Sequence, residues 1–477
     1  MKPNVTGTSL SMSVLYLTFF EPVVHNGIHE TQVRQLLYQL GTTCGNTLKL
    51  SYCALLPAVE IGRTEVLLRF ATERKELAAL KHDLGASGVT TSIFFLPIIL
   101  RKRWASSLPF PILALALALS TPLLLYKIYR TRPDVVHCRS YMATLLAVLA
   151  RFVFRDIKVI FDPRGFWPEE GVVAGRWSET SLRFKFWKYV EKKLFTGSDK
   201  VIALSKPFAD RVKSLADGAD CSVIFTCADV HKFDQARLSR NAKRADLGMQ
   251  GKMVFVYNGG LSAWHDPALL ARIYKTISQS FSDTMLLLIT GHSKQHLAAA
   301  FETEGVTQRD YLVVSAKPNE VPGYLATGDY GLVPLKTISR NTPMSVVAET
   351  MIGTKVAEYL STGLPIIVNQ NVGGLKTLMT EYSLGVTFDD GDLGRLPQAI
   401  FDFREHYSLA QRDCWFVAAR YFSTEQVAKS YYQIYAEITG LIGHNSVTRD
   451  RNCCYGVASK PVATDTFREE PLEVEES

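Results

Sequence analysis

The sequence predicts an α/β protein with more than one domain, and three observations support this fold class. The chain has 477 residues, a length at which one hydrophobic core gives way to two or three domains. Short apolar runs rich in β-branched residues alternate with amphipathic helical segments, which is the pattern of parallel strands covered by helices. Several of these runs end in glycine-containing turns, where proteins of this class bind their ligands.

Composition and charge restrict the classes of partner. Hydrophobic residues make up 47% of the chain and charged residues 21%, as in globular proteins. The net charge of +7 suits an anionic ligand or an anionic membrane surface. Because the basic residues form no concentrated face, we expect no nucleic-acid partner. The eight cysteines are scattered without a Cys-x-x-Cys motif, and the N-terminal residues lack a signal-peptide layout, so we expect a cytoplasmic protein without disulfides or zinc.

The first third of the chain begins with a strand, a turn and a helix. Residues 14–20 are aromatic and β-branched, which predicts a central strand, and residues 31–40 form an amphipathic helix. The connection contains Asn26-Gly27, which on its own is an ordinary turn between a strand and a helix. Further strands are predicted at 48–58 and 65–70, and a helix at 73–84.

Residues 105–126 carry no charge and approach the length of a membrane span. Three prolines interrupt this segment, and a span would place the strands on either side of it across a membrane from each other. We therefore interpret the segment as an apolar helix of the N-terminal domain. Docking into the membrane interface and spanning the membrane stay open as alternatives.

Polar side chains follow two consecutive predicted strands, at 133–140 and 157–162. The first strand delivers His137 and Arg139, and the second ends in Asp162 and Arg164. Because ligands bind at the carboxyl ends of parallel strands, these side chains are candidates for a site. Alternatively, His137 is a buried, hydrogen-bonded histidine, and Asp162 and Arg164 form a local ion pair.

The rest of the chain repeats the alternation of strands and helices. Strands at 199–205 and 221–225 with helices at 184–195 and 206–215 complete the first domain. Predicted strands at 253–260, 285–290, 311–315 and 329–334 belong to a second domain, with helices at 269–278 and 319–325. The strand at 253–260 ends in Gly259-Gly260.

Residues 354–374 are the most informative stretch. Val356 and Leu360 form the buried stripe of a short helix, and Glu358 lies on another face. A glycine and a proline end the helix, the strand 365–368 follows, and we expect Gly373-Gly374 to open a loop whose amides approach a ligand. Alternatively, Glu358 is a solvated surface acid paired with Lys355.

The run TKVAEYLSTGLPIIVNQNVGG resembles the donor-site signature of the retaining GT-B glycosyltransferases of family four. The resemblance implies two Rossmann-like domains that face each other across a cleft, with a C-terminal helix that crosses back to the first domain. We accordingly expect an N-terminal acceptor domain at 10–228, a nucleotide-sugar domain at 229–421 and a crossing helix at 422–440. Residues 444–477 are polar and then acidic, which predicts disorder.

The resemblance also implies roles for individual residues. The donor would be bound by Glu358, which would hold the ribose, and by residues of the turns and loops around it: Asn26, Gly27, Gly259, Gly260, Lys336, Thr354, Gly373 and Gly374. His137 would face the donor sugar, and Arg164 and Lys355 are candidates to meet the phosphate charge. DPRGFWPEE resembles a subset that makes surface polysaccharides, and we place Arg139, Asp162, Glu169 and Glu170 on the acceptor side.

The chain departs from the family pattern at three places. The arginine and lysine usual after the first glycine of the second domain are missing. Thr350 stands where a second carboxylate is usual, and Thr377 stands where a glutamate often follows the glycine turn. These departures leave open which cation neutralises the diphosphate.

The sequence thus predicts transfer of a sugar from a nucleotide-diphosphate donor to a saccharide or lipid-linked hydroxyl acceptor, in capsule, O-antigen or exopolysaccharide synthesis. We expect the reaction to retain anomeric configuration without a cofactor, and without a metal because we find no metal-binding Asp-x-Asp motif. The alternatives are a nucleotide-sugar epimerase on the same scaffold, or a degenerate homologue that binds a sugar nucleotide as the partner of an active transferase. Contact with the inner face of the cell membrane is a further expectation.

Overall fold

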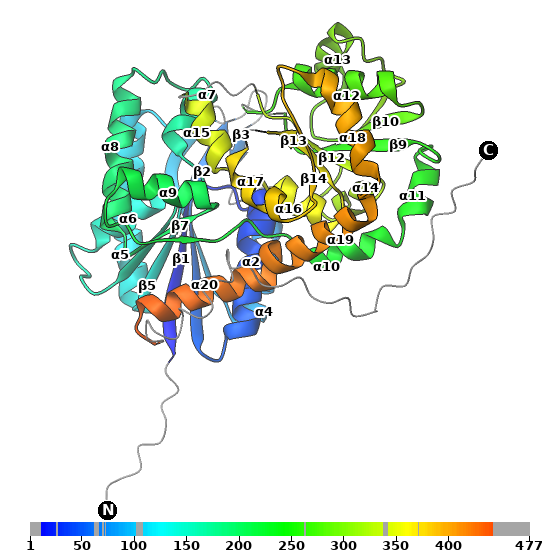
Figure 1. Ribbon diagram of the computed structural model, residues 1–477. Helices are drawn as coiled ribbons and strands as arrows, with labels where there is room; N and C mark the ends of the chain where they lie inside the picture. The colour runs from blue at the N-terminus through cyan, green and yellow to red at the C-terminus, as the bar shows by residue number, and fades with distance from the viewer. Residues whose placement is uncertain are drawn as a thin grey trace, which may run out of the picture.

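The structure is a computed structural model, and it describes most of the chain between residues 11 and 441. The described residues are 11–24, 27–61, 66–68, 71, 73–101, 108–261, 264–336, 342–370 and 372–441. Asn26, residues 105–107 of the apolar segment and the tail at 444–477 lie outside them. Figure 1 shows two α/β halves side by side, with one C-terminal helix lying along both.

The first half is built on an eight-stranded sheet with the order β3-β2-β1-β5-β6-β7-β8, in which β4 also pairs with β2. All pairs are parallel except β2 with β3. Side chains of β1 and β5 are buried almost throughout, as expected for strands covered on both faces. The strands are β1 (Met12–Phe19), β2 (Leu48–Ile61), β3 (Val66–Leu68), β4 (Thr90–Arg101), β5 (Val135–Arg139), β6 (Lys158–Asp162), β7 (Lys200–Ala203) and β8 (Cys221–Val223).

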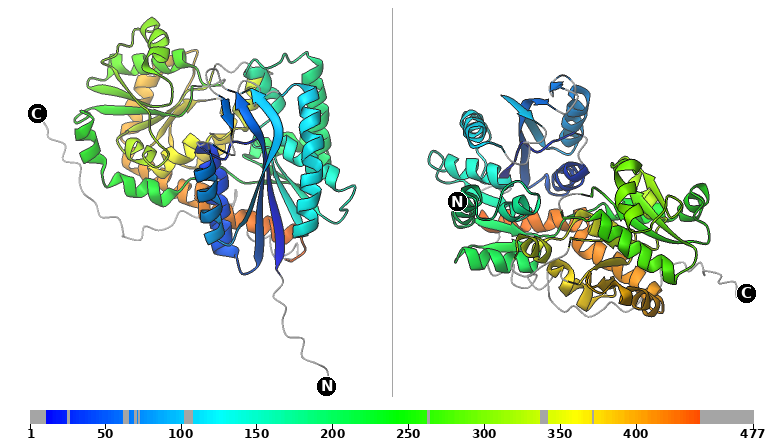
Figure 2. Two further views of the ribbon diagram at one scale, coloured as in Figure 1. Left: turned by 180° about the vertical axis from the view of Figure 1, so that it is seen from behind. Right: turned by 90° about the horizontal axis from the view of Figure 1, so that it is seen from above.

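Helices connect and cover these strands. The first runs without a break from Gly27 to Cys44, as α1 (Gly27–His29), the π-helical turn η1 (Glu30–Arg34) and α2 (Gln35–Cys44), so it begins earlier than predicted. The others are α4 (Arg74–Ala86), α5 (Phe110–Thr131), α6 (Tyr141–Ala150), α7 (Trp167–Val173), α8 (Leu182–Gly197) and α9 (Lys206–Leu215). In Figures 1 and 2, α5, α6 and α8 lie on the side of the first half away from the second.

The apolar helix α5 is long and apolar enough to cross a membrane by length and composition. It connects β4 to β5, which belong to the same sheet, so both of its ends lie in one domain. Its inner face packs on the sheet through Leu113, Leu124 and Ile128, while its outer face is exposed. This placement agrees with our interpretation of a helix of the N-terminal domain.

The second half has a six-stranded parallel sheet with the order β11-β10-β9-β12-β13-β14. The strands are β9 (Met253–Asn258), β10 (Thr284–Ile289), β11 (Tyr311–Val314), β12 (Tyr330–Val333), β13 (Ile366–Asn369) and β14 (Gly385–Phe388). The helices are α10 (Val230–Arg237), α11 (Arg240–Asp246), α12 (Pro267–Ser280), α13 (Lys294–Thr303), α14 (Val321–Leu325), α15 (Pro343–Thr350), α16 (Thr354–Ser361), α17 (Gly373–Glu381), the 3₁₀ turn η3 (Leu393–Arg395), α18 (Leu396–Arg404), α19 (Tyr407–Val417) and the π-helical turn η4 (Ala418–Phe422).

The last helix, α20 (Thr424–Ile438), returns from the second half to the first. Ser423 caps it by accepting a hydrogen bond from the backbone N–H of Gln426. Val427, Tyr431 and Tyr435 are buried in the same core as side chains of β1 and α2. The predicted crossing helix is therefore present and is part of the core of the first half.

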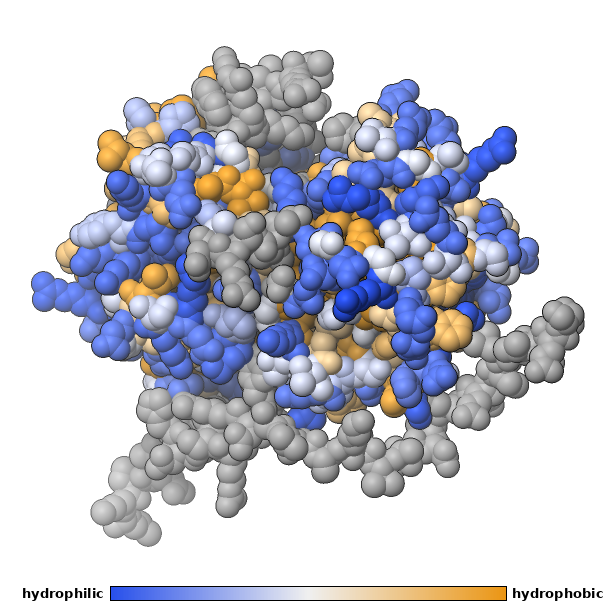
Figure 3. All heavy atoms as spheres, turned by 45° about the horizontal axis from the view of Figure 1, so that its top comes forward, coloured by the Kyte–Doolittle hydropathy of each residue, from blue (hydrophilic) through white to orange (hydrophobic). Residues whose placement is uncertain are grey.

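One expectation about this architecture is wrong, because Gly373-Gly374 begin helix α17 instead of opening a loop. A Cβ at Gly374 would lie 2.4 Å from the backbone oxygen of Met351, and one at Gly373 would lie 2.9 Å from that of Glu349. These glycines are needed where α17 packs closely on the end of α15. Most of the surface visible in Figure 3 is hydrophilic, with apolar side chains gathered in patches.

Candidate functional site

A cleft of about 940 Å³ lies between the two halves and receives residues from both. The first half contributes the N-terminal turns of the helix that starts at Gly27, together with Arg139, Arg164 and Glu170. The second half contributes the end of β9 and the first turns of α16. Strand ends from two facing sheets thus meet in one cavity, as the sequence predicts for a donor and an acceptor side.

Glu358 lines this cleft from helix α16 and is not a free surface acid. Its Oε2 accepts a hydrogen bond of 2.6 Å from Nδ2 of Asn258, the last residue of β9. Burial raises the pKa of Glu358 to about 7, although the Asn258 bond and the Lys355 charge both favour the ionised form. The alternative of a solvated surface carboxylate is therefore wrong.

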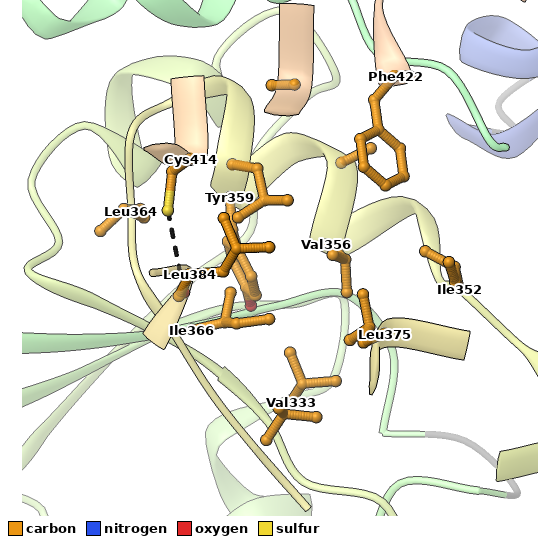
Figure 4. Close-up of a cluster of buried hydrophobic side chains, with 14 of the residues drawn as sticks. Val333, Ile352, Val356, Tyr359, Leu364, Ile366, Leu375, Leu384, Cys414 and Phe422 are labelled. Atoms are coloured by element: carbon orange, nitrogen blue, oxygen red, sulfur yellow. Dashed lines mark hydrogen bonds between the residues drawn. The ribbon is translucent and has the colours of Figure 1, made fainter. Parts of the chain in front are cut away.

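Helix α16 is held in position by an apolar core, which Figure 4 shows. Val356 and Leu360 are buried on the stripe that the sequence predicts, and Tyr359 is buried as well. The Oη of Tyr359 accepts a hydrogen bond of 2.8 Å from the backbone N–H of Asn258, so the residue that binds Glu358 is itself fixed by α16. A Cβ at Gly331 of β12 would lie 2.6 Å from the Tyr359 ring, so glycine is needed for this contact.

Lys355 also lines the cleft, one turn before Glu358 on the same helix. Its Nζ donates hydrogen bonds to Oη of Tyr257 at 3.0 Å and to Nε2 of His265 at 3.1 Å. It also lies 4.1 Å from the centre of the Tyr257 ring, a cation–π contact. Burial lowers the pKa of Lys355 to about 7. Within the described residues these two groups are its hydrogen-bond partners, which leaves one N–H for a ligand.

His265 can accept a hydrogen bond from Lys355 because the tautomer of its ring is fixed. Its Nδ1 lies 3.1 Å from the backbone oxygen of Pro334, and a carbonyl only accepts, so Nδ1 carries the proton. Burial and the Lys355 charge lower the pKa of His265 to about 3, so the ring stays neutral. Nε2 therefore presents a lone pair that orients the Lys355 ammonium group.

The glycine turn after β9 lies against this lysine. Gly259 has φ +111°, a conformation that favours glycine, and a Cβ there would lie 3.7 Å from Cε of Lys355. Gly259, Gly260 and Thr354 all line the cleft, as predicted for donor-binding residues. Lys336, Gly373 and Gly374 do not belong to its lining, so the structure does not bring these three predicted residues to the site.

On the opposite wall, two arginines converge on one glutamine. Nη2 of Arg139 donates to Oε1 of Gln32 at 3.4 Å, and Nη2 of Arg164 donates to the same oxygen. Arg139 is also paired with Glu21, with Nε 2.8 Å from Oε2. Gly27 begins the helix on this wall, and its predicted neighbour Asn26 lies outside the described residues.

His137 does not face the cleft, and this corrects the expectation that it contacts the donor sugar. The side chain is fully buried, with Nδ1 2.7 Å from Oη of Tyr435 on α20 and Nε2 3.5 Å from Oδ2 of Asp162. Asp162 is equally buried and accepts a hydrogen bond of 3.2 Å from Oη of Tyr431. Both residues join α20 to the first half, and the alternative of a buried histidine is correct.

The adjacent residues Glu169 and Glu170 differ in their surroundings. Glu169 is buried away from the cleft, and its Oε1 accepts a hydrogen bond of 2.8 Å from Nζ of Lys188. Glu170 lines the cleft beside Arg164, and burial raises its pKa to about 7. The predicted acceptor side therefore contains Arg139 and Glu170, and does not contain Glu169 or Asp162.

Within the part of the chain that the structure describes, no group of three or more His, Cys, Asp or Glu side chains could hold a metal ion. The sequence does contain one Asp-x-Asp spacing, at Asp390 and Asp392, which corrects the expectation that the chain lacks this spacing. These residues follow the edge strand β14 and do not line the cleft.

Four residues of the site were not predicted as such: Gln32, Tyr257, Asn258 and His265. Asn258 and Tyr257 stand directly before the Gly259-Gly260 turn, so their place at a strand end was a usable signal. His265 and Gln32 act by orienting charged neighbours, and no spacing in the sequence marks such a role.

Residues 76–232 match the model of the family Glycosyltransferase Family 4. The match lies almost wholly in the first half and includes the wall that bears Arg139, Arg164 and Glu170. A sequence search of the curated proteins gives no match.

Solved structures resemble the chain over nearly its whole described length. Sucrose-phosphate synthase from Thermosynechococcus elongatus has a TM-score of 0.64 at 14% identity, with 90% of this chain and 100% of that chain covered. A glycosyltransferase from Rickettsia africae has a TM-score of 0.62 at 14% identity, with 90% and 98% covered. Anabaena HepE in complex with UDP-glucose has a TM-score of 0.58 at 14% identity, with 89% and 99% covered.

The fold is GT-B. Its two parallel-sheet domains and its returning C-terminal helix are those that the sequence predicts. Together with the family match in the first domain, this fold indicates a glycosyltransferase.

Proposed function

We propose that this protein transfers a sugar from a nucleotide-diphosphate donor to a hydroxyl acceptor, with retention at the anomeric carbon and without a metal ion. The observation that carries the proposal is the position of Glu358. Its carboxylate is fixed by Asn258 at the carboxyl end of β9 and faces the cleft. It lies one helical turn from the cation Lys355. The carboxylate fits the ribose hydroxyls of a nucleoside diphosphate, and the buried cation beside it fits the phosphates.

In this arrangement the second domain binds the donor. Glu358 accepts hydrogen bonds from the ribose, and Lys355 meets the diphosphate charge in place of the two cations missing from the usual positions. The N-terminal amides of α16 and the amide of Gly260 add donors that favour an anion, whereas the amide of Gly259 donates to the backbone oxygen of Ile289. The complex of Anabaena HepE with UDP-glucose supports a uridine-type donor for this cleft.

Catalysis by these residues is mainly electrostatic. The leaving diphosphate gains negative charge in the transition state, and positioned N–H groups and Lys355 stabilise it there. The acceptor lies against the wall formed by Arg139, Arg164 and Glu170, and closure of the two domains holds donor and acceptor together. A carboxylate such as Glu170 fits hydrogen bonding to the acceptor hydroxyl.

The biological setting we propose is synthesis of a surface polysaccharide or glycolipid by a cytoplasmic protein that contacts the membrane peripherally. The run DPRGFWPEE supports the first part. The outer face of α5 supports the second, because Leu115, Tyr126 and Tyr129 are exposed along it. Large exposed aromatic and aliphatic side chains on one helix face suit the membrane interface.

The test is release of nucleoside diphosphate by the purified protein, measured with UDP-glucose and other nucleotide sugars against a panel of saccharide and lipid-linked acceptors. We expect acceptor-dependent release and a product with retained configuration in the presence of a chelator. Binding of nucleotide sugar without turnover would favour the partner role instead, which the absence of a second carboxylate at Thr350 also suggests. Failure of every nucleotide sugar to bind would refute the proposal.

A further inference from the structure

A second, smaller cavity lies in the first domain, outside the donor and acceptor cleft. It has a volume of about 110 Å³ and is lined almost entirely by aromatic and aliphatic side chains. They come from five segments that are distant in sequence: the end of β1, and the N-terminal parts of α5, α6, α7 and α8. Among them are Phe20, Leu113, Met142, Trp167 and Trp187.

The pocket shares its inner wall with the cleft. At the end of β5, Arg139 lines the cleft and the next residue, Ser140, lines the pocket. At the end of β6, Arg164 lines the cleft, and Trp167 lines the pocket three residues later. The same strand ends therefore serve both cavities, and the pocket adjoins the wall that we assign to the acceptor.

Two helices of the pocket wall, α5 and α8, also expose apolar side chains. Phe110 of α5 and Phe186 of α8 are 42% and 45% exposed, and their rings meet edge to face at 5.1 Å. Lys185 is exposed next to Phe186, and Lys192 and Lys193 are exposed about two turns further along α8. An apolar face with lysines at its border is complementary to an anionic membrane surface. The pocket thus lies between such a surface and the acceptor wall.

One residue of the pocket lining carries a buried polar group that has no partner among the described residues. The side chain of Trp187 is 1% exposed, and its Nε1–H makes no hydrogen bond within the described residues. A buried N–H without an acceptor is costly, so such a group is expected to be satisfied by a ligand oxygen. The pocket therefore fits a molecule that places an oxygen next to a short apolar segment.

We propose that this pocket binds the first apolar segment of a membrane lipid that carries the acceptor hydroxyl, with Trp187 as hydrogen-bond donor to the linking oxygen. The inference rests on the proposed transferase function and specifies its acceptor as lipid-linked. The lipid chain lies along α5 and α8, its proximal segment fills the pocket, and its saccharide end reaches the wall at Arg139 and Arg164.

The test is calorimetric titration of the full chain with methyl, butyl, hexyl and octyl glucoside, each below its micelle concentration. Burial of methylene groups predicts affinity that rises about fourfold for each methylene until the pocket is filled. The variant Leu113→Trp, which fills the pocket, should remove this dependence on chain length. Leu117→Trp adds the same volume one turn further along α5, outside the lining, and should preserve it.

Two further variants and one binding measurement keep the test decisive. If Leu113→Trp does not fold, Met142→Trp blocks the pocket from a half-buried position. Trp187→Phe keeps an aromatic ring but removes the N–H, and this variant should bind every glucoside more weakly. Affinity independent of chain length, or equal effects of Leu113→Trp and Leu117→Trp, would overturn the proposal. UDP-glucose binding in these variants separates a failure of the pocket proposal from a failure of the proposed transferase function. Binding should be unchanged when only the pocket is lost, and it should be absent if the transferase function is wrong.

Discussion

Burial brings the two ligand-facing charges of the second domain close to neutrality. It raises the pKa of Glu358 to about 7 and lowers that of Lys355 to about 7. In the function that we propose, an ionised Glu358 accepts from the ribose and a protonated Lys355 meets the diphosphate. Because both groups are buried, a charged group of a ligand interacts more strongly with them than it would with the same two groups in water.

The pH dependence of donor use follows from these two groups. As the pH falls below 7, Glu358 takes up a proton, and as it rises above 7, Lys355 loses one, so kcat/KM for the donor should be bell-shaped with a maximum near pH 7. Lys355→Arg keeps its charge at high pH and should remove the alkaline limb. An unchanged alkaline limb in this variant would show that another group supplies the cation.

Removal of the Glu358 charge should weaken donor binding directly. A hydrogen bond to a charged group contributes about 1.5–3 kcal/mol, so Glu358→Gln should lower affinity for the nucleotide sugar about 10- to 100-fold. Calorimetric titration with UDP-glucose measures this change. The matched control is Glu405→Gln, an exposed residue at the end of α18, which should bind as the wild type does. Equal affinities of the two variants would remove Glu358 from the site.

At the level of elements, α20 connects the two halves through buried polar contacts. Oη of Tyr435 lies 2.7 Å from Nδ1 of His137, and Tyr435→Phe would leave that buried nitrogen unsatisfied. We expect a loss of about 1–3 kcal/mol in the free energy of unfolding, seen as a lower urea midpoint. Donor affinity should not change, because His137 lies outside the cleft.

The control for this variant is Tyr432→Phe on the same helix. Its hydroxyl lies 2.8 Å from Oγ1 of Thr47 but is only partly buried, so the loss of stability should be smaller. If Tyr435→Phe instead abolished turnover while the urea midpoint stayed the same, His137 would regain the catalytic role expected from the family resemblance.

The glycines that begin α17 should act through packing. A Cβ at Gly374 would lie 2.4 Å from the Met351 oxygen, so Gly374→Ala must shift α17 away from the end of α15, at a cost of about 1–3 kcal/mol. Thermal unfolding measures this loss. Gly291→Ala is the control in the same domain, because nothing lies within 4 Å of its Cβ position. Wild-type stability of Gly374→Ala would contradict a packing role for this glycine.

At the scale of the whole molecule, the cleft lies between the two halves and the apolar helices lie on the far side of the first half. In Figure 1, α5 and α8 are separated from the second half by the sheet of the first half. A membrane that contacts this side would leave the donor domain free to move. Domain closure and membrane contact can therefore occur together.

Replacement of Lys185, Lys192 and Lys193 by glutamate should weaken binding to vesicles that contain anionic lipids. Each lysine near such a surface contributes about 1 kcal/mol, so sedimentation should show a loss of about two orders of magnitude in affinity, and added salt should weaken wild-type binding. Replacement of Lys294, Lys317 and Lys376, which are exposed on the second domain, is the matched control. Similar losses from both triple variants would contradict a defined membrane face.

The order of strands and helices could be predicted from the sequence because it depends on local patterns. The β-branched runs at 14–20 and 365–368 and the stripe of Val356 and Leu360 each identify an element by the spacing of its own residues. Gly373-Gly374 was misassigned because glycine favours loops locally, whereas here it permits close packing against a segment over twenty residues away.

The sequence by itself determined the α/β architecture and the helices and strands within it, since each follows from residues close together in the chain. The crossing of the last helix and the place of Glu358 in a cleft were expected from the family resemblance. Only the tertiary structure decided which polar residues reach the cleft. His137 and Arg139 are two positions apart on β5, yet one is buried against α20 and the other lines the cavity. The reason is that the surroundings of a strand side chain depend on the helix that covers its face, and that helix lies about three hundred residues later in the chain.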